Sequence, residues 1–209
     1  MYENLRGKTI SFEGGEGAGK STIMKMLAEV LEKDGLDIVV TREPGGNKIS
    51  EQIREVIVDK ENTSICNETE CLLYAASRAQ LITENIKPLL ATNKTILFDR
   101  FVDSSYVYQG FVRGLGIERV KEINEFATNG FMPNVTILFD IEPELGFKRI
   151  AENNRSTNRL DLEGLDFHRQ VRRGYKMIAD LYPNRIKVID ASKTPDEVLE
   201  EVLNILKTI

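Results

Sequence analysis

Residues 14–21 read Gly-Gly-Glu-Gly-Ala-Gly-Lys-Ser and come directly after the apolar run Thr9-Ile-Ser-Phe-Glu13. The octet matches G-x-x-x-x-G-K-[ST] in the context that this pattern requires, at the end of a strand and the start of a helix. Glycines let the backbone curl until successive N–H groups point at phosphate oxygens, and the next helix adds the positive end of its dipole. Lys20 adds a cation for the β- and γ-phosphates, and Ser21 offers a hydroxyl to Mg²⁺. The predicted phosphate-binding loop comprises Gly14, Gly15, Glu16, Gly17, Ala18, Gly19, Lys20, Ser21 and Thr22.

The pattern of strand followed by helix repeats along the chain. The strand-like apolar runs are Thr9–Glu13, Asp37–Thr41, Thr95–Asp99, Val135–Asp140 and Ile186–Asp190. Apolar residues recur at helical spacing between these runs, and a long helix is predicted from about Glu68 to Lys87, ended by Pro88. This alternation predicts an α/β fold with a five-stranded parallel sheet and helices on both faces. Ligands of such a fold bind at the carboxyl ends of the strands.

Composition narrows the class of protein. The 209 residues are enough for one large domain, and no linker or repeat divides residues 1–209. A net charge of -5 argues against nucleic-acid or anionic-membrane partners. The apolar runs are too short to span a bilayer, and the N-terminus lacks the apolar core of a signal peptide. Cys66 and Cys71 have no metal-binding spacing and indicate reduced thiols, so we expect a cytoplasmic protein.

Polar residues follow the carboxyl ends of the predicted strands. Asp99 ends an apolar strand, as does the aspartate that holds Mg²⁺ in phosphate-loop enzymes through water and the loop hydroxyl. Asp140 ends its strand in the same way but lacks a neighbouring arginine, whereas Arg100 follows Asp99 directly. We therefore predict Ser21 and Asp99 as the metal-binding pair.

Several classes of protein share the phosphate-binding loop. A GTPase would need Asn-Lys-x-Asp, and neither Asn47-Lys48 nor Asn93-Lys94 is followed by that aspartate. A small kinase fits the size of the chain. Arg155 and Arg159 lie in a polar stretch at about 152–162, where a mobile lid could close over a triphosphate and neutralise its charge.

The nature of the acceptor is left open by the chemistry alone. A monophosphate is mostly a dianion at pH 7, so it needs cations rather than a general base, and Arg42, Arg54 and Arg100 could supply them. A nucleoside would need a carboxylate to accept the hydroxyl proton, and Glu13, Glu16 and Glu43 are possible bases.

Over essentially its whole length the chain resembles the thymidylate kinase family, especially the bacterial form. The segments that carry the resemblance are 12–22, Thr41-Arg-Glu-Pro-Gly-Gly46, Leu73-Tyr-Ala-Ala-Ser-Arg78, Asp99-Arg100, Asp103-Ser-Ser-Tyr-Val-Tyr-Gln-Gly110 and Asn158-Arg-Leu-Asp161. The resemblance implies a nucleoside-monophosphate kinase fold with a small lid segment. It also implies direct transfer of the γ-phosphoryl of MgATP to dTMP, in dTTP biosynthesis, by a homodimer.

The resemblance also implies roles for single residues. Lys20, Arg42, Arg100, Arg155 and Arg159 would serve catalysis, with Arg42, Arg54 and Arg100 holding the dTMP phosphate. Glu16 would contact the sugar 3′-hydroxyl, and Tyr108 would crowd the ribose 2′ position. Thymine would stack on Tyr74 and be read by Arg78, Ser105 and Gln109, because its carbonyls need donors and its N–H needs an acceptor.

Two alternatives remain at this point. Many relatives have Phe where this chain has Tyr74, which leaves open a kinase for another deoxynucleotide or a deoxynucleoside. A nucleotide-dependent switch is the third possibility, against which the missing guanine-reading motif and the basic lid both count.

Overall fold

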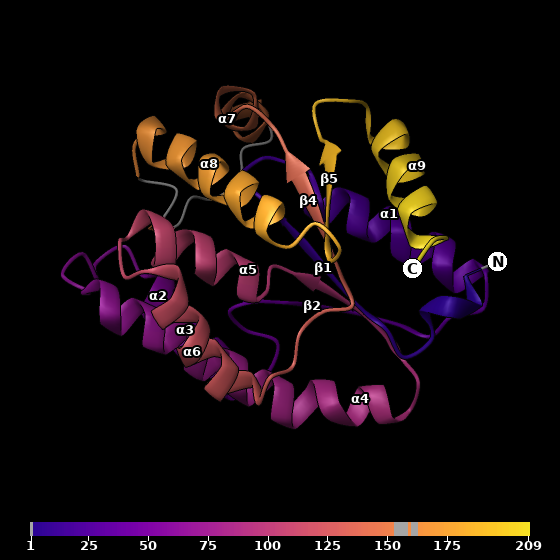
Figure 1. The fold of residues 1–209 in the computed structure, drawn as a ribbon, viewed down its shortest axis with the longest axis horizontal. Coiled ribbons are helices and arrows are strands. Elements are labelled where there is room, and N and C mark those ends of the chain that lie inside the picture. Colours follow the sequence, from indigo (N-terminus) through magenta and orange to yellow (C-terminus); the bar gives the residue numbers. More distant parts are fainter. Residues whose placement is uncertain (1, 153–158, 160–162) are drawn as a thin grey trace.

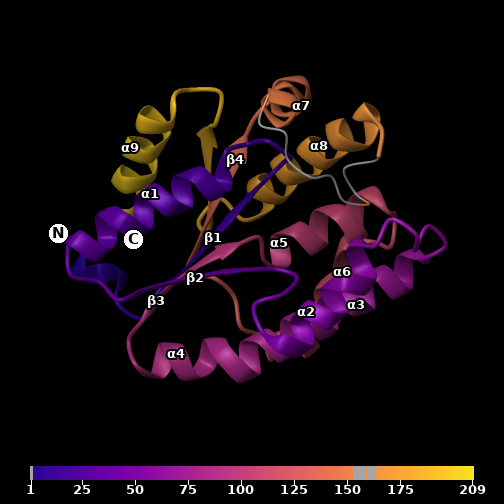
Figure 2. The same ribbon diagram turned by 180° about the vertical axis from the view of Figure 1, so that it is seen from behind.

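Five parallel strands form the centre of the molecule. The computed structural model describes residues 2–152, 159 and 163–209. The sheet has the order β2-β3-β1-β4-β5, as Figures 1 and 2 show from opposite sides. The strands are β1 (Thr9–Gly14), β2 (Ile38–Arg42), β3 (Thr95–Asp99), β4 (Val135–Asp140) and β5 (Ile186–Asp190). The predicted strands agree with these bounds to within one residue, and the predicted α/β class is confirmed.

Helices cover both faces of the sheet because alternate strand residues are apolar on both sides. On one face, Ile10, Phe12 and Leu97 pack with the buried sides of α1 (Lys20–Lys33) and α9 (Pro195–Leu206). On the other face, Ile96 and Phe98 pack with α3 (Asn67–Leu81) and α8 (Leu165–Leu181). The side chains of β1, β3 and β4 are buried along nearly their whole length, which is typical of central parallel strands.

Local sequence explains where several helices begin. The side chain of Asn47 accepts a hydrogen bond from Ser50 N at the start of α2 (Lys48–Val58). Thr194 and Glu197 form a capping box at the start of α9. Each interaction satisfies backbone N–H groups that have no partner inside the helix.

The prediction that Pro88 ends a helix is wrong. Helix α3 continues through a π-helical turn (Ile82–Ile86) into α4 (Lys87–Ala91), and Pro88 lies in the first turn of α4. Proline lacks an N–H and clashes with the carbonyl four residues earlier in a regular helix. The wider turn at 82–86 changes that hydrogen-bond register, so the chain keeps its helical direction past the proline.

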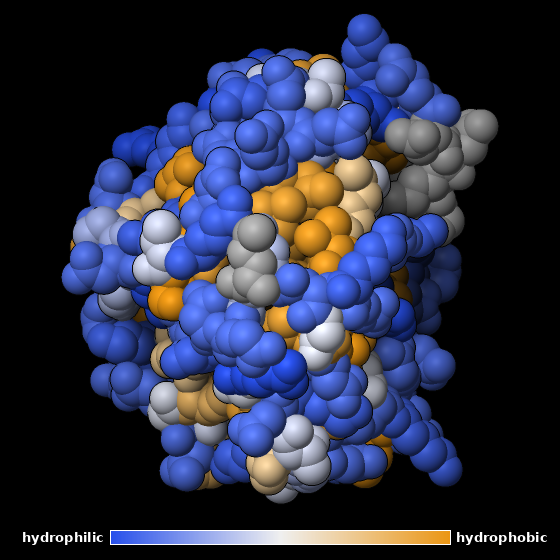
Figure 3. Space-filling view, turned by 90° about the vertical axis from the view of Figure 1, so that its right-hand side faces the viewer, coloured by the Kyte–Doolittle hydropathy of each residue, from blue (hydrophilic) through white to orange (hydrophobic). Residues whose placement is uncertain are grey.

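Three further helices follow β3 and β4 in the chain. A short α5 (Val102–Ser105) leads into a second π-helical turn (Tyr106–Val112), followed by α6 (Ile117–Thr128) and α7 (Pro143–Glu152). No helix in the described part of the chain is long and apolar enough to cross a membrane. The side of the molecule that carries both chain ends is mostly hydrophilic, with an apolar area near its middle (Figure 3).

Strand register brings the polar strand ends together. Asp99 is the register partner of both Phe12 on β1 and Arg42 on β2, and Gly14 is the partner of Phe139 on β4. The start of the phosphate-binding loop therefore lies beside the ends of β3 and β4. This edge of the sheet positions the site described next.

Candidate active site

A pocket of about 280 Å³ opens at the carboxyl ends of the strands. It brings together residues from the phosphate-binding loop, the ends of β2 and β3, helices α2 and α3, and the second π-helical turn. The predicted site residues that line it are Glu16, Gly17, Ala18, Gly19, Lys20, Ser21, Thr22, Arg42, Arg54, Tyr74, Arg78, Asp99, Arg100, Ser105, Tyr108 and Gln109. Residues from distant parts of the sequence thus share one cavity.

The phosphate-binding loop is closed over its own lysine. The Lys20 Nζ donates to the carbonyl oxygens of Gly14 (3.0 Å) and Gly15 (2.9 Å). Burial, helped by the nearby positive charge of Arg100, lowers the pKa of Lys20 to about 8. Ser21 Oγ donates to Asp99 Oδ2 at 3.0 Å, so the hydroxyl and carboxylate predicted to serve a metal ion are adjacent.

The loop packs backbone to backbone against helix α7. A Cβ on Gly17 would lie 2.1 Å from the carbonyl oxygen of Gly146, and a Cβ on Gly146 would lie 2.3 Å from that of Glu16. The φ of Gly17 is +70°, in the left-handed region that other residues rarely adopt. Only glycine fits at either position, so α7 supports the loop from outside.

Arg100 is held by an unusual backbone turn at the end of β3. Its φ of +68° lies in the left-handed region, and functional sites often hold non-glycine residues there. The next residue, Phe101, donates its N–H to Glu13 Oε1 at 2.6 Å. The Arg100 guanidinium donates to Glu16 Oε1 (2.6 Å) and to the carbonyl oxygen of Gly14 (3.0 Å), and it lies 5.4 Å from the centre of the Tyr108 ring.

Glu13 supports this turn and lies away from the pocket. It is fully buried, and its second oxygen, Oε2, accepts hydrogen bonds from Ser104 (2.6 Å) and Tyr175 (2.9 Å). Burial and the nearby Asp103 raise the pKa of Glu13. A carboxylate enclosed in this way cannot reach a substrate hydroxyl. Glu13 is therefore excluded as a general base.

Arg42 and Arg54 lie at the mouth of the pocket. Arg42 pairs with Glu51 at 2.8 Å, and more than half of its side chain is exposed. Arg54 NH1 donates to the carbonyl oxygen of Pro44 at 3.0 Å. Arg42 ends β2 and Arg54 contacts the loop that follows this strand, and both line the same pocket as Lys20.

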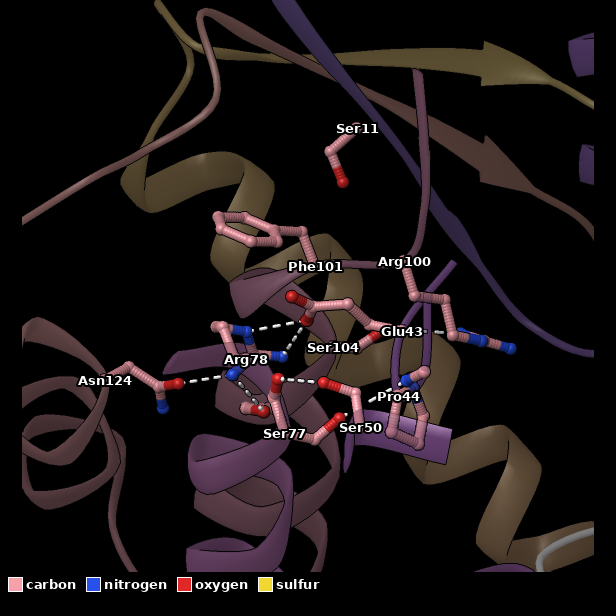
Figure 4. A network of polar contacts seen from close by, with 12 residues as sticks. Ser11, Glu43, Pro44, Ser50, Ser77, Arg78, Arg100, Phe101, Ser104 and Asn124 are labelled. Carbon is pink, nitrogen blue, oxygen red and sulfur yellow. Dashed lines mark hydrogen bonds and ion pairs between the residues drawn. The ribbon is translucent and has the colours of Figure 1, made fainter. Parts of the chain in front are cut away.

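Arg78 is buried and lines the pocket, and Figure 4 shows it beside its polar partners Glu43 and Asn124. Its Nε and NH2 contact Glu43 Oε2 at 2.6 Å, and its NH1 donates to Ser105 Oγ (3.1 Å) and to Asn124 Oδ1. These contacts use four of its five N–H groups and leave one on NH2. Burial raises the pKa of Glu43 to about 7 although Arg78 opposes the shift, and Glu43 Oε1 has no hydrogen-bond partner among the described residues.

The other residues predicted to hold a nucleobase gather around Arg78. Tyr74 is half-buried on α3, and burial raises its pKa to about 12. Gln109 is buried on the π-helical turn and donates its Nε2–H to Glu70 Oε1 at 2.9 Å. The Tyr108 hydroxyl is buried without a hydrogen-bond partner, and burial raises its pKa.

Some predicted residues lie elsewhere. Arg159 donates to the carbonyl oxygen of Ile57 at 3.0 Å and to Glu70 Oε2, at the α2–α3 side of the pocket. Arg155 and most of the predicted lid segment lie outside the described residues. Asp140, which also ends an apolar strand, forms a two-point ion pair with Arg172 (2.6 and 3.0 Å) and a contact with Lys176 at 3.2 Å. The charge of its carboxylate is therefore compensated by basic side chains.

Sequence reasoning missed a second hollow of about 380 Å³ on the other side of the phosphate-binding loop. Gly17–Gly19 and Thr22 separate it from the first pocket, and Arg149, Ala191 and Lys193 form its far wall. Arg149 donates to the carbonyl oxygens of Ala191 (2.8 Å) and Ser192 (3.1 Å). The position of Ala191–Lys193 directly after the carboxyl end of β5 was the signal that could have revealed it.

Fold and site together define a phosphate-loop kinase of the nucleoside-monophosphate class. The thymidylate kinase family model matches residues 12–202. The chain is 52% identical over 203 residues to the thymidylate kinase of Clostridium novyi, which covers 97% of this chain and 99% of the relative. It is 50% identical over 204 residues to that of Bacillus pumilus, covering 97% and 96%.

A solved structure of the thymidylate kinase from Ehrlichia chaffeensis matches the fold with a TM-score of 0.77 at 28% identity, covering 97% of this chain and 99% of that chain. The chain belongs to the thymidylate kinase family.

The lowered pKa of Lys20 predicts that nucleotide binding takes up a proton. Phosphates favour protonated Lys20, whereas near pH 8.5 the free protein holds it largely deprotonated, given its pKa of about 8. We expect the affinity for ATP to fall as the pH rises above 8. Calorimetric titration at pH 8.5 in two buffers of different ionisation enthalpy should give different apparent enthalpies, and the difference should shrink at pH 7. Equal enthalpies at pH 8.5 would contradict the shift.

The contact between α7 and the loop predicts a strong effect of Gly146→Ala. The added Cβ would overlap the Glu16 carbonyl oxygen and displace the loop, so we expect ATP affinity to fall by about tenfold or more. Gly164→Ala is the matched control, because a Cβ at Gly164 meets no atom of the described residues within 4 Å. Equal dissociation constants for ATP in both variants would show that the loop does not depend on this contact.

Proposed function

We propose that the residues of this cleft transfer the γ-phosphoryl group of MgATP directly to the phosphate of dTMP. The observation that carries the proposal is the set of charged and polar side chains that line one cavity. Lys20 and Arg100 line it together with Arg78, Gln109 and Tyr74. Such a cavity offers cations to two phosphate groups and a donor–acceptor pair to one base. Membership of the thymidylate kinase family agrees with this reading.

The donor nucleotide would lie along the phosphate-binding loop. Lys20 and the loop amides would bind its phosphates, and its base would enter the second hollow beside Arg149 and Lys193. Ser21 and Asp99 would hold Mg²⁺, which neutralises phosphate charge when bound. Oxygen ligands suit this ion, and one carboxylate together with substrate phosphates is its usual environment.

The acceptor phosphate would lie between Arg42, Arg54 and Arg100. A phosphate dianion attacks without a general base, which agrees with the enclosure of Glu13 and with the packing of Glu43 against Arg78. Glu16 would turn toward the sugar 3′-hydroxyl once the phosphate engages Arg100. Arg155 and Arg159, on the predicted lid segment, would add charge at the transferring group, for which Arg159 would exchange its ion pair with Glu70 for phosphate.

The base would stack on Tyr74, a contact that is worth about 1–3 kcal/mol in other sites. Arg78 and Ser105 would face the 4-carbonyl group and Gln109 the N3–H. Tyr108, packed against Arg100, would fill the space beside C2′ and favour deoxyribose.

Exposed apolar side chains support a homodimer. Ile49 and Val56 on α2, Leu72 on α3 and Phe126 on α6 are exposed, Phe126 by 91%. Helix α3 packs against both α2 and α6, and both ribbon views show the three side by side. Contiguous exposed apolar side chains favour association.

We also propose a single working domain over residues 1–209 and action in the cytoplasm, where free thiols such as Cys66 and Cys71 persist.

An ADP-release assay with MgATP tests the proposal. The acceptors are dTMP, dUMP, dGMP, AMP and thymidine. We expect turnover that strongly favours dTMP, with thymidine inactive because the arginines of the pocket suit a phosphate acceptor. The possible bases that line the pocket, Glu16 and Glu43, are each paired with an arginine. Preference for another acceptor would keep the phosphate site but overturn the assignment of the base-reading residues. Nucleotide binding without turnover of any acceptor would indicate a switch instead.

The metal assignment predicts that Asp99→Asn raises the Mg²⁺ concentration needed for half-maximal activity by about tenfold, because one carboxylate ligand loses its charge. Removing divalent ions with EDTA should abolish turnover of the unaltered protein. Asp140→Asn is the matched control, since that carboxylate already pairs with Arg172. An unchanged Mg²⁺ dependence in Asp99→Asn would place the ion elsewhere.

A further inference from the structure

A buried carboxylate lies directly behind the base-reading end of the pocket. Glu70, on α3, is only 2% exposed. Its Oε1 accepts a hydrogen bond from Gln109 Nε2 at 2.9 Å, and its Oε2 accepts one from Arg159. Glu70 does not itself line the pocket, whereas Gln109 does.

This contact determines how the Gln109 amide is turned. A glutamine amide has a donor end and an acceptor end, whereas a carboxylate only accepts. The NH₂ group must therefore face Glu70, and the carbonyl Oε1 is the end left for the pocket. In the opposite rotamer the Gln109 carbonyl oxygen would face the Glu70 carboxylate, which would place two acceptors against each other.

Cations compensate the charge of Glu70. Arg159 forms an ion pair with its Oε2, and Arg113 Nε lies 3.6 Å from its Oε1. A buried charge is costly unless it is paired and hydrogen-bonded. The two arginines let Glu70 remain an acceptor inside the fold, and Arg113 in turn pairs with Glu163 at 2.7 Å.

We propose that Glu70 is a positioning residue that sets the base preference of the enzyme. By holding Gln109 with its carbonyl toward the pocket, it makes the site accept pyrimidines that carry an N3–H and a 4-carbonyl group. It rejects those that carry an unprotonated N3 and a 4-amino group. The inference rests on the proposed function, because it assumes that the base lies against Arg78 and Gln109.

The expected preference follows from pairing donors with acceptors. dTMP and dUMP both present an N3–H to the Gln109 carbonyl and a carbonyl group to Arg78. dCMP presents an acceptor at N3 to the Gln109 carbonyl, and its amino group faces the Arg78 donors. Unpaired polar groups are costly when they are buried, so both mismatches count against dCMP. Glu70 therefore controls the choice between dTMP and dCMP but not the choice between dTMP and dUMP.

The test is Glu70→Gln, with kcat/KM measured for dTMP, dUMP and dCMP. A glutamine at position 70 can pair with either end of the Gln109 amide, so the orientation is lost. We expect the ratio of kcat/KM for dTMP over dCMP to fall by about tenfold, mainly through KM for dTMP. The ratio for dTMP over dUMP should stay unchanged. Glu68→Gln is the matched control, because it makes the same change at an exposed position of α3.

A purely structural role gives a different result. If Glu70 acted only through Arg159 or through stability, Glu70→Gln would lower activity with all three nucleotides alike and leave both ratios intact, which would overturn the proposal. In a Gln109→Ala background, Glu70→Gln should have no further effect on the dTMP/dCMP ratio. A further fall there would also overturn it.

The exchanged pair, Glu70→Gln with Gln109→Glu, keeps the proposal testable if the single variant does not fold. The carboxylate introduced at position 109 would still offer an acceptor to N3–H, while the amide introduced at position 70 donates to that carboxylate. The dTMP/dCMP ratio should therefore exceed that of Gln109→Ala, and a ratio no higher than that contradicts the proposal. ATP binding reports the fold of each variant. Failure of the unaltered protein to phosphorylate dTMP would instead reject the proposed function.

Discussion

Compensation of buried positive charge is the constraint on which this cleft depends. A site for two nucleotides needs many cations in one cavity, and without ligands each cation must find another partner. Here the chain supplies them: carbonyl oxygens for Lys20, and the carboxylates of Glu16, Glu51, Glu43 and Glu70 for Arg100, Arg42, Arg78 and Arg159. The cleft is thus held in a receptive form by internal contacts that resemble those a substrate would make.

The ion pairs differ in how far their side chains are exposed to solvent. The side chains of Arg42 and Glu51 are 53% and 38% exposed, and those of Arg100 and Glu16 are 18% and 15% exposed. Such pairs exchange easily for phosphate, because water already competes with them. Arg78 and Glu43 are 1% and 3% exposed, so this pair stays intact when a ligand enters. Under the proposed function, phosphate would be bound by arginines that can change partner, and the base would be read by an arginine that cannot.

The sequence alone predicted the sheet and the phosphate-binding loop, because both depend on local pattern. Apolar runs indicate strands that are buried on both faces. The spacing of the glycines in the loop indicates where the backbone adopts conformations that other residues rarely reach. The interaction of Glu70 with Gln109 joins residues 39 positions apart, and the roles of Asn124 and Arg149 likewise depend on tertiary neighbours. Pro88 was misread for a related reason, since the π-helical turn that accommodates it carries no strong local signal.

Strand β1 links the loop that carries Lys20 to the turn that carries Arg100. Its last residue, Gly14, starts the loop that holds Lys20, and the Gly14 carbonyl oxygen also accepts a hydrogen bond from Arg100. Its neighbour Glu13 fixes the turn after Arg100 through Phe101 N. Residues 9–12 of β1 pair with residues 96–99 of β3, so the loop that carries Lys20 and the turn that carries Arg100 follow two neighbouring strands. Phosphoryl transfer depends on positioning and charge more than on covalent participation by the protein. The two neighbouring strands, joined at their ends by the contact of Arg100 with the Gly14 carbonyl oxygen, would provide that positioning.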